Sequence, residues 1–427
     1  MSTGFPAPPS FAGAWTCPFC PLACDHLRVD VGAASLSLQG GVCARASLAL
    51  AQHANQTVPG LAELDGQHCA PPKAITAAAR LLTSSRQPLF AGLGTDVSGA
   101  RALYSLANAT GAICDAAGGA ALMPGLRALQ DRGQFTTTLA EVRTRADVIV
   151  FIGGLPTGLA PLVRERFGVG EAGQLARHVV VLGPEPQDAA QLAAWTGAGV
   201  SVESIALQGD LFSTLSILLA LLADRTVPAA SQALGSLAQR LRAARYGVLV
   251  GAPQRLPAQA ALIIEAVHHA VGELNRNTRA AALWIGGGNG AATVNQVFTW
   301  LSGLPLRSRA GPHGLEHEPL CFDTQRLLAD KAVDALLWVA SFDAELAPPP
   351  NQLPMIVLGP PALAVACRRP GTVFIAVSTP GIGCDGDVFR TDGTVLMPLH
   401  AVRRDALPSV ADVAKGLLLA LNEMRAA

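Results

Sequence analysis

Short runs of β-branched and other apolar residues recur along the chain, and an amphipathic stretch follows most of them. Apolar runs of this length are typical of strands that are buried on both faces, as in parallel sheets. The runs predict eight strands, over residues 88–94, 147–154, 178–184, 246–251, 283–287, 335–340, 355–359 and 372–377. The intervening stretches predict helices, the clearest over residues 72–84, 211–222 and 258–271.

This alternation of strand and helix predicts an α/β fold with right-handed crossovers. At 427 residues the chain is too long for a single core, so we expect more than one domain. The spacing predicts two doubly wound α/β domains with parallel sheets, over residues 71–226 and 227–370, with a linker near Thr226. A Cys-loop region over residues 1–70 precedes them, and a C-terminal segment over residues 371–427 follows.

The composition is apolar and electrically balanced. Half of the residues are hydrophobic, 15% are charged, and the mean hydropathy is +0.36. No stretch reaches the roughly 18 apolar residues of a membrane span. A chain this apolar has either very thorough burial or large surfaces that other subunits cover, and we favour the second. The net charge is zero and there is no basic stripe, which argues against nucleic-acid binding. The N-terminus lacks a secretory signal and the nine cysteines are an odd number, which indicates a reducing cytoplasm.

Four cysteines near the N-terminus, Cys17, Cys20, Cys24 and Cys43, follow the pattern C-x2-C-x3-C with a later fourth cysteine. Three thiols in one short loop converge on a small volume, and a strand-like segment over residues 27–31 returns the fourth. Four thiolates suit an iron–sulfur cluster or zinc. The spacing differs from that of zinc ribbons and favours a [4Fe-4S] cluster, with zinc or free thiols as the alternatives. The five other cysteines are scattered, mostly in apolar segments, and are typical of buried free thiols.

Two glycine-rich turns follow predicted strands, one over residues 92–94 and one over residues 286–290. Backbone N–H groups at such turns can bind phosphate, but neither turn matches the dinucleotide fingerprint, and glycine also serves tight turns without a ligand. We therefore interpret both turns as structural. His313 and His317 have helical spacing, but the flanking Gly and Pro predict a loop and we expect no metal there.

The N-terminal cysteine motif resembles that of the molybdopterin and tungstopterin oxidoreductases. Most of the chain is similar to the B subunit of formylmethanofuran dehydrogenase and to its bacterial relative, the B subunit of the formyltransferase/hydrolase complex of methylotrophs. The segments that carry the resemblance are CPFCPLACDHLRV with GGVCARA, GAICDAAGG, ALQDRGQFTTTLAEVRTRADVIVFIGGLP, GGGNGAATVNQVFTWLSGLPLRSRAG, VDALLWVAS and GIGCDGDVFRTDGTVLMPL. The stretches T-L-x-E-x3-R-A-D-x5-G and G-N-x5-N-Q-V-x-T-W are fairly specific together.

The resemblance implies a molybdopterin-oxidoreductase-like fold, with a [4Fe-4S] cluster and a bis-pterin tungsten or molybdenum centre in the redox-active family. There a metal-ligating cysteine or selenocysteine, followed by His-Gly-Pro, lies just past the GAI-x-D segment. The matching positions in this chain are Ala121 and Leu122, and neither side chain can bind a metal or move a proton. The family's basic P-R-H run is replaced by apolar residues over 158–162. We therefore expect no catalytic residue and no tungsten or molybdenum pterin.

Three functions remain open. The favoured one is a non-catalytic structural subunit of a formyltransferase/hydrolase complex in tetrahydromethanopterin-linked conversion of formaldehyde to formate. As partners the resemblance implies an amidohydrolase-like hydrolase subunit, a β-helical subunit and a formyltransferase subunit. The alternatives are an active tungsten or molybdenum oxidoreductase subunit and an electron-transfer subunit that uses only the four-cysteine site.

Overall fold

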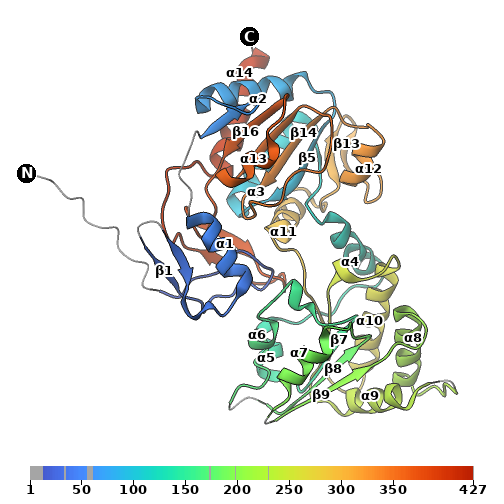
Figure 1. Cartoon of the computed structure of the whole chain (residues 1–427). Coiled ribbons are helices and arrows are strands. Elements are labelled where there is room, and N and C mark those ends of the chain that lie inside the picture. Colours follow the sequence, from blue (N-terminus) through green and yellow to red (C-terminus); the bar gives the residue numbers. More distant parts are fainter. Residues whose placement is uncertain are drawn as a thin grey trace, which may run out of the picture. The chain divides into compact units, whose positions relative to one another are not determined.

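The structure is a computed structural model that describes residues 13–32, 35–54, 61–172, 175–197, 199–228 and 230–426. The prediction about a signal segment concerns mainly residues 1–12, which lie outside this range. The chain forms two compact units, drawn with all elements in Figure 1. Unit 1 comprises residues 1–119, 288–390 and 396–427, and unit 2 comprises residues 120–287 and 391–395.

Unit 1 is built on a nine-stranded sheet with the strand order β13-β12-β6-β5-β14-β15-β16-β3-β4. Its central strands are parallel and almost wholly apolar: β6 (Ile113–Cys114), β5 (Pro88–Gly94), β14 (Ala335–Ala340), β15 (Met355–Gly359) and β16 (Thr372–Ala376). Antiparallel hairpins close both edges: β12 (Ser308–Gly311) with β13 (Gly314–His317), and β3 (Ala62–Leu64) with β4 (Gln67–His68).

Helices cover both faces of this sheet. One face packs against α2 (Pro71–Ser84), α3 (Val97–Thr110), α11 (Ala291–Ser302) and α14 (Val410–Ala426). Figure 1 shows α2 and α14 side by side on that face. The other face packs against α12 (Thr324–Ala329), η4 (Pro361–Leu363) and α13 (Ala364–Cys367). The parallel strands read as unbroken apolar runs because both of their faces are covered.

Unit 2 is built on a five-stranded parallel sheet with the order β11-β10-β7-β8-β9. The strands are β7 (Val148–Ile152), β8 (Arg177–Leu182), β9 (Val200–Ile205), β10 (Gly247–Gly251) and β11 (Ala280–Trp284). One face packs against α8 (Leu211–Leu222), α9 (Gln232–Ala243) and α10 (Ala260–Leu274). On the other face Phe151 stacks against Phe167 at 6.0 Å between ring centroids and meets Trp195 edge-on at 5.8 Å.

The remaining elements are short. In unit 1 they are β1 (Val29–Val31), β2 (Leu36–Leu38), η1 (Gln39–Gly41), α1 (Ala44–Ala54), β17 (Gly386–Phe389) and β18 (Leu396–Leu399). Starting at the end of unit 1 and continuing through unit 2 they are α4 (Gly119–Arg132), α5 (Leu139–Arg145), η2 (Pro156–Gly158), α6 (Val163–Arg166), α7 (Asp188–Trp195) and η3 (Pro253–Arg255). Polar side chains start several helices: the Asp96 carboxylate accepts from Gly99 N at α3, and the Asp210 carboxylate accepts from Ser213 N at α8.

The predicted α/β class with parallel sheets is confirmed. Each of the eight predicted strands and each of the three predicted helices is present, with shifts of a few residues at the ends. Pattern reading missed β9, in which polar and apolar residues alternate, and it missed β6 and the edge hairpins, whose strands are only two to four residues long. The units alternate along the chain, and the linker predicted near Thr226 lies inside unit 2.

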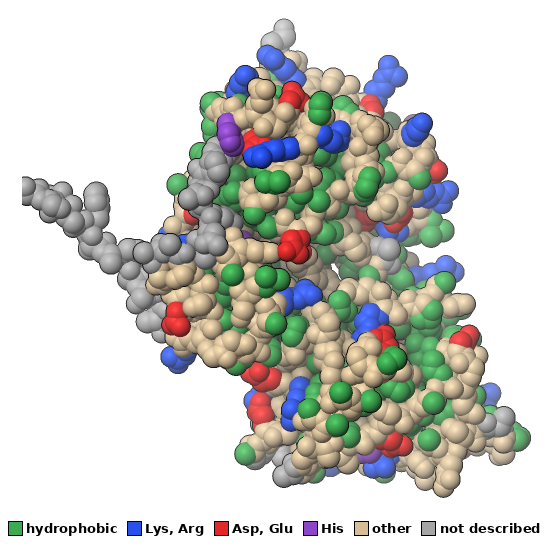
Figure 2. Space-filling model, viewed as in Figure 1, with side chains coloured by type: hydrophobic (Ala, Val, Ile, Leu, Met, Phe, Trp, Pro, Cys, Tyr) green, Lys and Arg blue, Asp and Glu red, His purple; other side chains and the backbone are tan. Residues whose placement is uncertain are grey.

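The surface is rich in apolar side chains. Fifteen large hydrophobic residues of the described chain are exposed, among them Leu320 at 69%, Val365 at 68% and Trp300 at 51%. Figure 2 shows hydrophobic side chains over much of the visible face, among few charged ones. No helix in the described part of the chain is long and apolar enough to cross a membrane.

Unit 2 contains a buried histidine. His268 on α10 is 8% exposed, and its Nε2 accepts a hydrogen bond from Trp284 Nε1 at 3.0 Å. Burial lowers the pKa of His268 from its ordinary 6.5 to about 4. The ring is therefore neutral in the folded protein at pH values where the unfolded chain already binds a proton.

We expect the free energy of unfolding to fall by up to about 3 kcal/mol as the pH is lowered from 6.5 to 4, because only the unfolded state is protonated in that window. His268→Gln should remove this part of the pH dependence, since an amide oxygen can still accept from Trp284 and does not titrate. Pulse proteolysis of the co-expressed complex in denaturant at several pH values, read from the band of this chain, measures the effect. The partly exposed neighbour His269 provides the control, and an identical loss of pH dependence in His269→Gln would contradict the assignment.

Candidate functional site

The cysteine region lies in unit 1 and forms a closed loop before α1. Trp15 N donates to Leu27 O at 2.7 Å, and Cys17 N donates to Cys24 O at 2.8 Å, so the loop returns on itself. Cys43 directly precedes α1, and its carbonyl accepts from Ser47 N at 3.0 Å. The strand-like segment predicted over residues 27–31 is β1, which pairs with β2.

The four cysteine side chains are buried. Cys17, Cys20, Cys24 and Cys43 are between 2% and 8% exposed. Burial raises the pKa of Cys17, and its electrostatic interactions with Cys20, Cys24 and Cys43 raise it further. Among the described residues, however, no group of three or more His, Cys, Asp or Glu side chains has the geometry of a metal site. That these cysteines hold a metal therefore stays a prediction.

Aromatic and imidazole contacts fix the cysteine region to the carboxyl edge of the sheet of unit 1. Trp15 Nε1 donates to Gly381 O at 2.9 Å, beyond the end of β16. His53 on α1 bridges the Ala49 carbonyl at 2.8 Å and the Thr379 hydroxyl at 3.0 Å. The Phe19 ring lies between these anchors, 6.0 Å from Trp15 and 5.7 Å from His53 between ring centroids. The loop therefore covers the edge at which open α/β sheets bind ligands.

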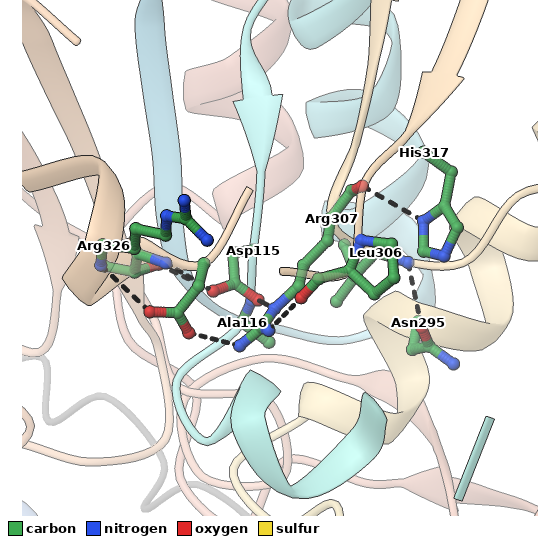
Figure 3. A network of polar contacts seen from close by, with 10 residues as sticks. Asp115, Ala116, Asn295, Leu306, Arg307, His317 and Arg326 are labelled. Atoms are coloured by element: carbon green, nitrogen blue, oxygen red, sulfur yellow. Dashed lines mark hydrogen bonds and ion pairs between the residues drawn. The ribbon is translucent and has the colours of Figure 1, made fainter. Parts of the chain in front are cut away.

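A buried ionic network holds the segment that follows β6 (Figure 3). Arg307, 4% exposed, donates from Nε to Asp115 Oδ1 at 3.4 Å and also bonds the Asp323 carboxylate and Pro319 O. Thr324 donates from N and Oγ1 to Asp115 Oδ2 at 3.0 and 2.9 Å. Burial raises the pKa of Asp115, whereas the charge of Arg307 and the donors of Thr324 oppose that rise.

The same network shapes the backbone. Arg307 has a φ of +64°, a conformation that non-glycine residues rarely adopt, and Arg307 N donates to Cys114 O at 2.7 Å. Gly119 passes so near Asp115 that an added Cβ would lie 2.1 Å from Oδ1. Two residues later the chain reaches Ala121 and Leu122 at the start of α4, both partly buried. The backbone that leads to the expected metal-ligand position is therefore held by contacts within the protein. The side chains at that position and the next are only the methyl group of Ala121 and the isobutyl group of Leu122.

The two glycine-rich turns pack against each other. An added Cβ would lie 2.6 Å from Asn289 O at Gly94, and 2.4 Å from Thr95 O at Gly290. Gly290 also has a φ of +75°. Glycine is required there because two backbones approach closely, which supports the structural interpretation of both turns.

Unit 2 contains a pocket of about 1100 Å³ lined by residues that follow β7, β8 and β10. The run over residues 158–162 contributes Gly158, Leu159, Pro161 and Leu162 to its wall. The charged groups in the pocket come from elsewhere: Arg255 pairs with Glu185 at 2.5 Å, and Arg164 Nε donates to Val169 O at 3.3 Å. The apolar replacements noted in the sequence thus face a pocket at the ligand-binding edge of a parallel sheet.

The histidine pair belongs to a hairpin. His313 lies in the turn between β12 and β13, and His317 on β13 bonds Arg307 O through Nδ1 at 3.1 Å. Sequence reasoning missed Arg307, Asp323 and Arg255. Nothing in their local sequence marks them, because each acts through a partner that is distant along the chain.

Comparison with known proteins identifies relatives of this architecture. No family model matches the chain. The chain is 31% identical over 353 residues to the B subunit of the formyltransferase/hydrolase complex Fhc of Methylorubrum extorquens, and this match covers 82% of this chain and 94% of that protein. It is 27% identical to the B subunit of the tungsten-containing formylmethanofuran dehydrogenase 2 of Methanocaldococcus jannaschii, over 88% of this chain and 90% of that protein.

A solved structure agrees with these sequence matches. One chain in the crystal structure of the formyltransferase/hydrolase complex FhcABCD from Methylorubrum extorquens, determined with methylofuran, superposes with a TM-score of 0.73 at 29% identity. The match covers 86% of this chain and 100% of that chain. Fold and sequence define a protein of the same type as the B subunit of formylmethanofuran dehydrogenase. Within that class, the chain belongs to the family of the B subunit of the formyltransferase/hydrolase complex.

We expect Arg307→Ala to lower the free energy of unfolding by about 3–5 kcal/mol, because removal of one partner leaves the Asp115 carboxylate buried without its counter-charge. Pulse proteolysis of the co-expressed complex in denaturant, read from the band of this chain, measures the loss. Arg326 on α12 is the matched control, since its pair with Asp330 is exposed and should be worth at most about 1 kcal/mol. Equal effects of Arg307→Ala and Arg326→Ala would contradict a structural role for the buried network.

Proposed function

We propose that this chain is a non-catalytic structural subunit of a formyltransferase/hydrolase complex in tetrahydromethanopterin-linked conversion of formaldehyde to formate. The observation that carries the proposal is the pair Ala121 and Leu122 at the end of the segment that Asp115 anchors. Their side chains have neither a lone pair for a metal nor a transferable proton. Formyl transfer and hydrolysis need no redox step, so a subunit without a metal centre is compatible with such a complex.

The alternative is an active tungsten or molybdenum oxidoreductase subunit, which the names of the tungsten-containing relatives favour. The residues of this chain do not fit that role. A pterin-bound metal of this family needs a protein thiolate and nearby polar groups to orient its ligands. Here Ala121 and Leu122 lie in the first turn of α4, and the run at 158–162 lines its pocket with apolar groups.

The four buried cysteines do fit a cofactor by their chemistry. Cys17, Cys20, Cys24 and Cys43 are soft thiol ligands, and they are shielded from solvent. We propose that they hold a [4Fe-4S] cluster, which would supply one-electron transfer when bound. The finer fold assignment, a molybdopterin-oxidoreductase-like layout with an N-terminal Cys-rich region, belongs to the same proposal.

The proposed partners are an amidohydrolase-like hydrolase subunit, a β-helical subunit and a formyltransferase subunit, in the cytoplasm. The support comes from the exposed apolar side chains and from the solved relative, which is a chain of a multi-subunit complex. Apolar patches larger than a few hundred Å² usually mark sites of association.

Metal analysis of the natively purified complex tests the proposed function. We expect no stoichiometric tungsten or molybdenum, and about four iron atoms per chain with the absorption of a [4Fe-4S] cluster in an anaerobic spectrum. Iron should be lost in Cys17→Ser and kept in Cys367→Ser, whose thiol is buried elsewhere in unit 1. Stoichiometric tungsten or molybdenum would refute the non-catalytic role, and zinc or no metal would refute only the cluster.

Co-expression tests the structural role. Expressed alone, the chain should aggregate, because its apolar surfaces lack their partners; co-expressed with the other subunits, it should elute with them. Gel filtration of both preparations measures this. If the chain purified alone as a cooperatively unfolding monomer while the other subunits kept full activity without it, the structural role would be wrong.

A further inference from the structure

A serine, a histidine and a glutamate form a hydrogen-bonded chain on the sheet of unit 2. In the parallel pair of β8 and β9, His178 lies opposite Ser201 and Val180 lies opposite Glu203. Ser201 and Glu203 are therefore two residues apart on the face that His178 shares. Ser201 Oγ is 2.6 Å from His178 Nδ1, and Glu203 Oε2 is 3.1 Å from His178 Nε2.

We propose that Ser201 is an activated nucleophile that accepts acyl groups from small esters, with His178 as its general base and Glu203 as the group that orients His178. A hydroxyl bonded to an imidazole that a carboxylate holds from its other nitrogen is the arrangement by which serine becomes reactive. This activity goes beyond the proposed function and does not depend on it.

The contacts determine which nitrogen carries the proton. An ionised carboxylate only accepts hydrogen bonds, so His178 donates from Nε2–H to Glu203. Nδ1 is then left as the acceptor for the Ser201 hydroxyl. Burial lowers the pKa of His178 and the positive charge of Arg240 on α9 lowers it further, although Glu203 opposes them. The ring is therefore neutral at pH 7 and can accept a proton.

Exposure of the three side chains matches these roles. The His178 side chain is 11% exposed and that of Glu203 is 32% exposed, so both are partly shielded, whereas Ser201 is open to solvent. β9 is the last strand of its sheet, and it has no further strand neighbour among the described residues. An ester in solution can therefore approach Oγ.

The reaction consists of two balanced steps. Ser201 Oγ attacks the ester carbonyl carbon while its proton passes to His178 Nδ1; the carbon–oxygen bond to the alcohol breaks, and the alcohol leaves with that proton. Water then attacks the acyl-serine, giving a proton to His178 that returns to Ser201 Oγ as the acyl group leaves. The products are the carboxylic acid and free Ser201.

A fluorophosphonate probe tests the proposal on the full chain, purified as it is produced, with peptide mass spectrometry to locate the label. We expect the label on Ser201, and about 100-fold slower labelling in His178→Gln, since general-base catalysis contributes on the order of 10²–10⁴ in rate. Glu203→Gln should slow labelling while preserving the shape of the site. p-Nitrophenyl acetate should give a burst that Ser201→Ala abolishes.

Ser204 is the internal control, because it is exposed on the same strand without a histidine opposite it. If the probe labels Ser201 no faster than Ser204, the hydrogen bonds among Ser201, His178 and Glu203 only stabilise the pairing of the two strands. That result would overturn the proposal. Unchanged labelling in a His178→Gln variant with wild-type circular dichroism would overturn it as well.

Discussion

The hydrogen bonds and ion pairs of the buried Arg307 guanidinium are the interactions on which this part of unit 1 depends. One side chain bonds the Asp115 carboxylate, directly after β6, together with the Pro319 carbonyl and the Asp323 carboxylate in the loop before α12, so it joins two segments of the chain. Its backbone adopts a left-handed conformation to do so. A charge that is 4% exposed is tolerated only when such partners surround it, so the segments cannot move independently.

Because of this constraint, the backbone around Asp115 and Gly119 does not depend on the side chain at position 121. Asp115 and Gly119 are held against each other whether or not a metal follows, because their contacts are made with protein atoms alone. The fold around position 121 therefore does not depend on which side chain that position carries. The glycine turns are constrained in the same way by a backbone contact, between Gly290 and Thr95. The fold is accordingly kept at 29% identity to the solved relative.

Much of the fold was predictable from the sequence, for a physical reason. Strands such as β5 and β14 are buried on both faces, so every position must be apolar and the run is visible without knowledge of its neighbours. β9 is an edge strand whose exposed residues Ser201 and Ser204 interrupt the run, so its pattern carries little signal. The division into units was not readable, because the chain crosses between them several times.

The candidate sites show the same limit at the level of side chains. The cysteine motif could be read directly because its first three members are close in sequence and share one short loop. Asp115 and Arg307 are 192 residues apart, and His178 and Glu203 lie on different strands, so only the folded sheet brings these partners together. Chemistry that depends on residues close in sequence can be recognised as a motif, as with the first three cysteines. A site whose residues come from different strands has no motif in the local sequence. Such a site is found only in the folded structure, where parallel strands place polar side chains opposite each other, as with His178 and Ser201.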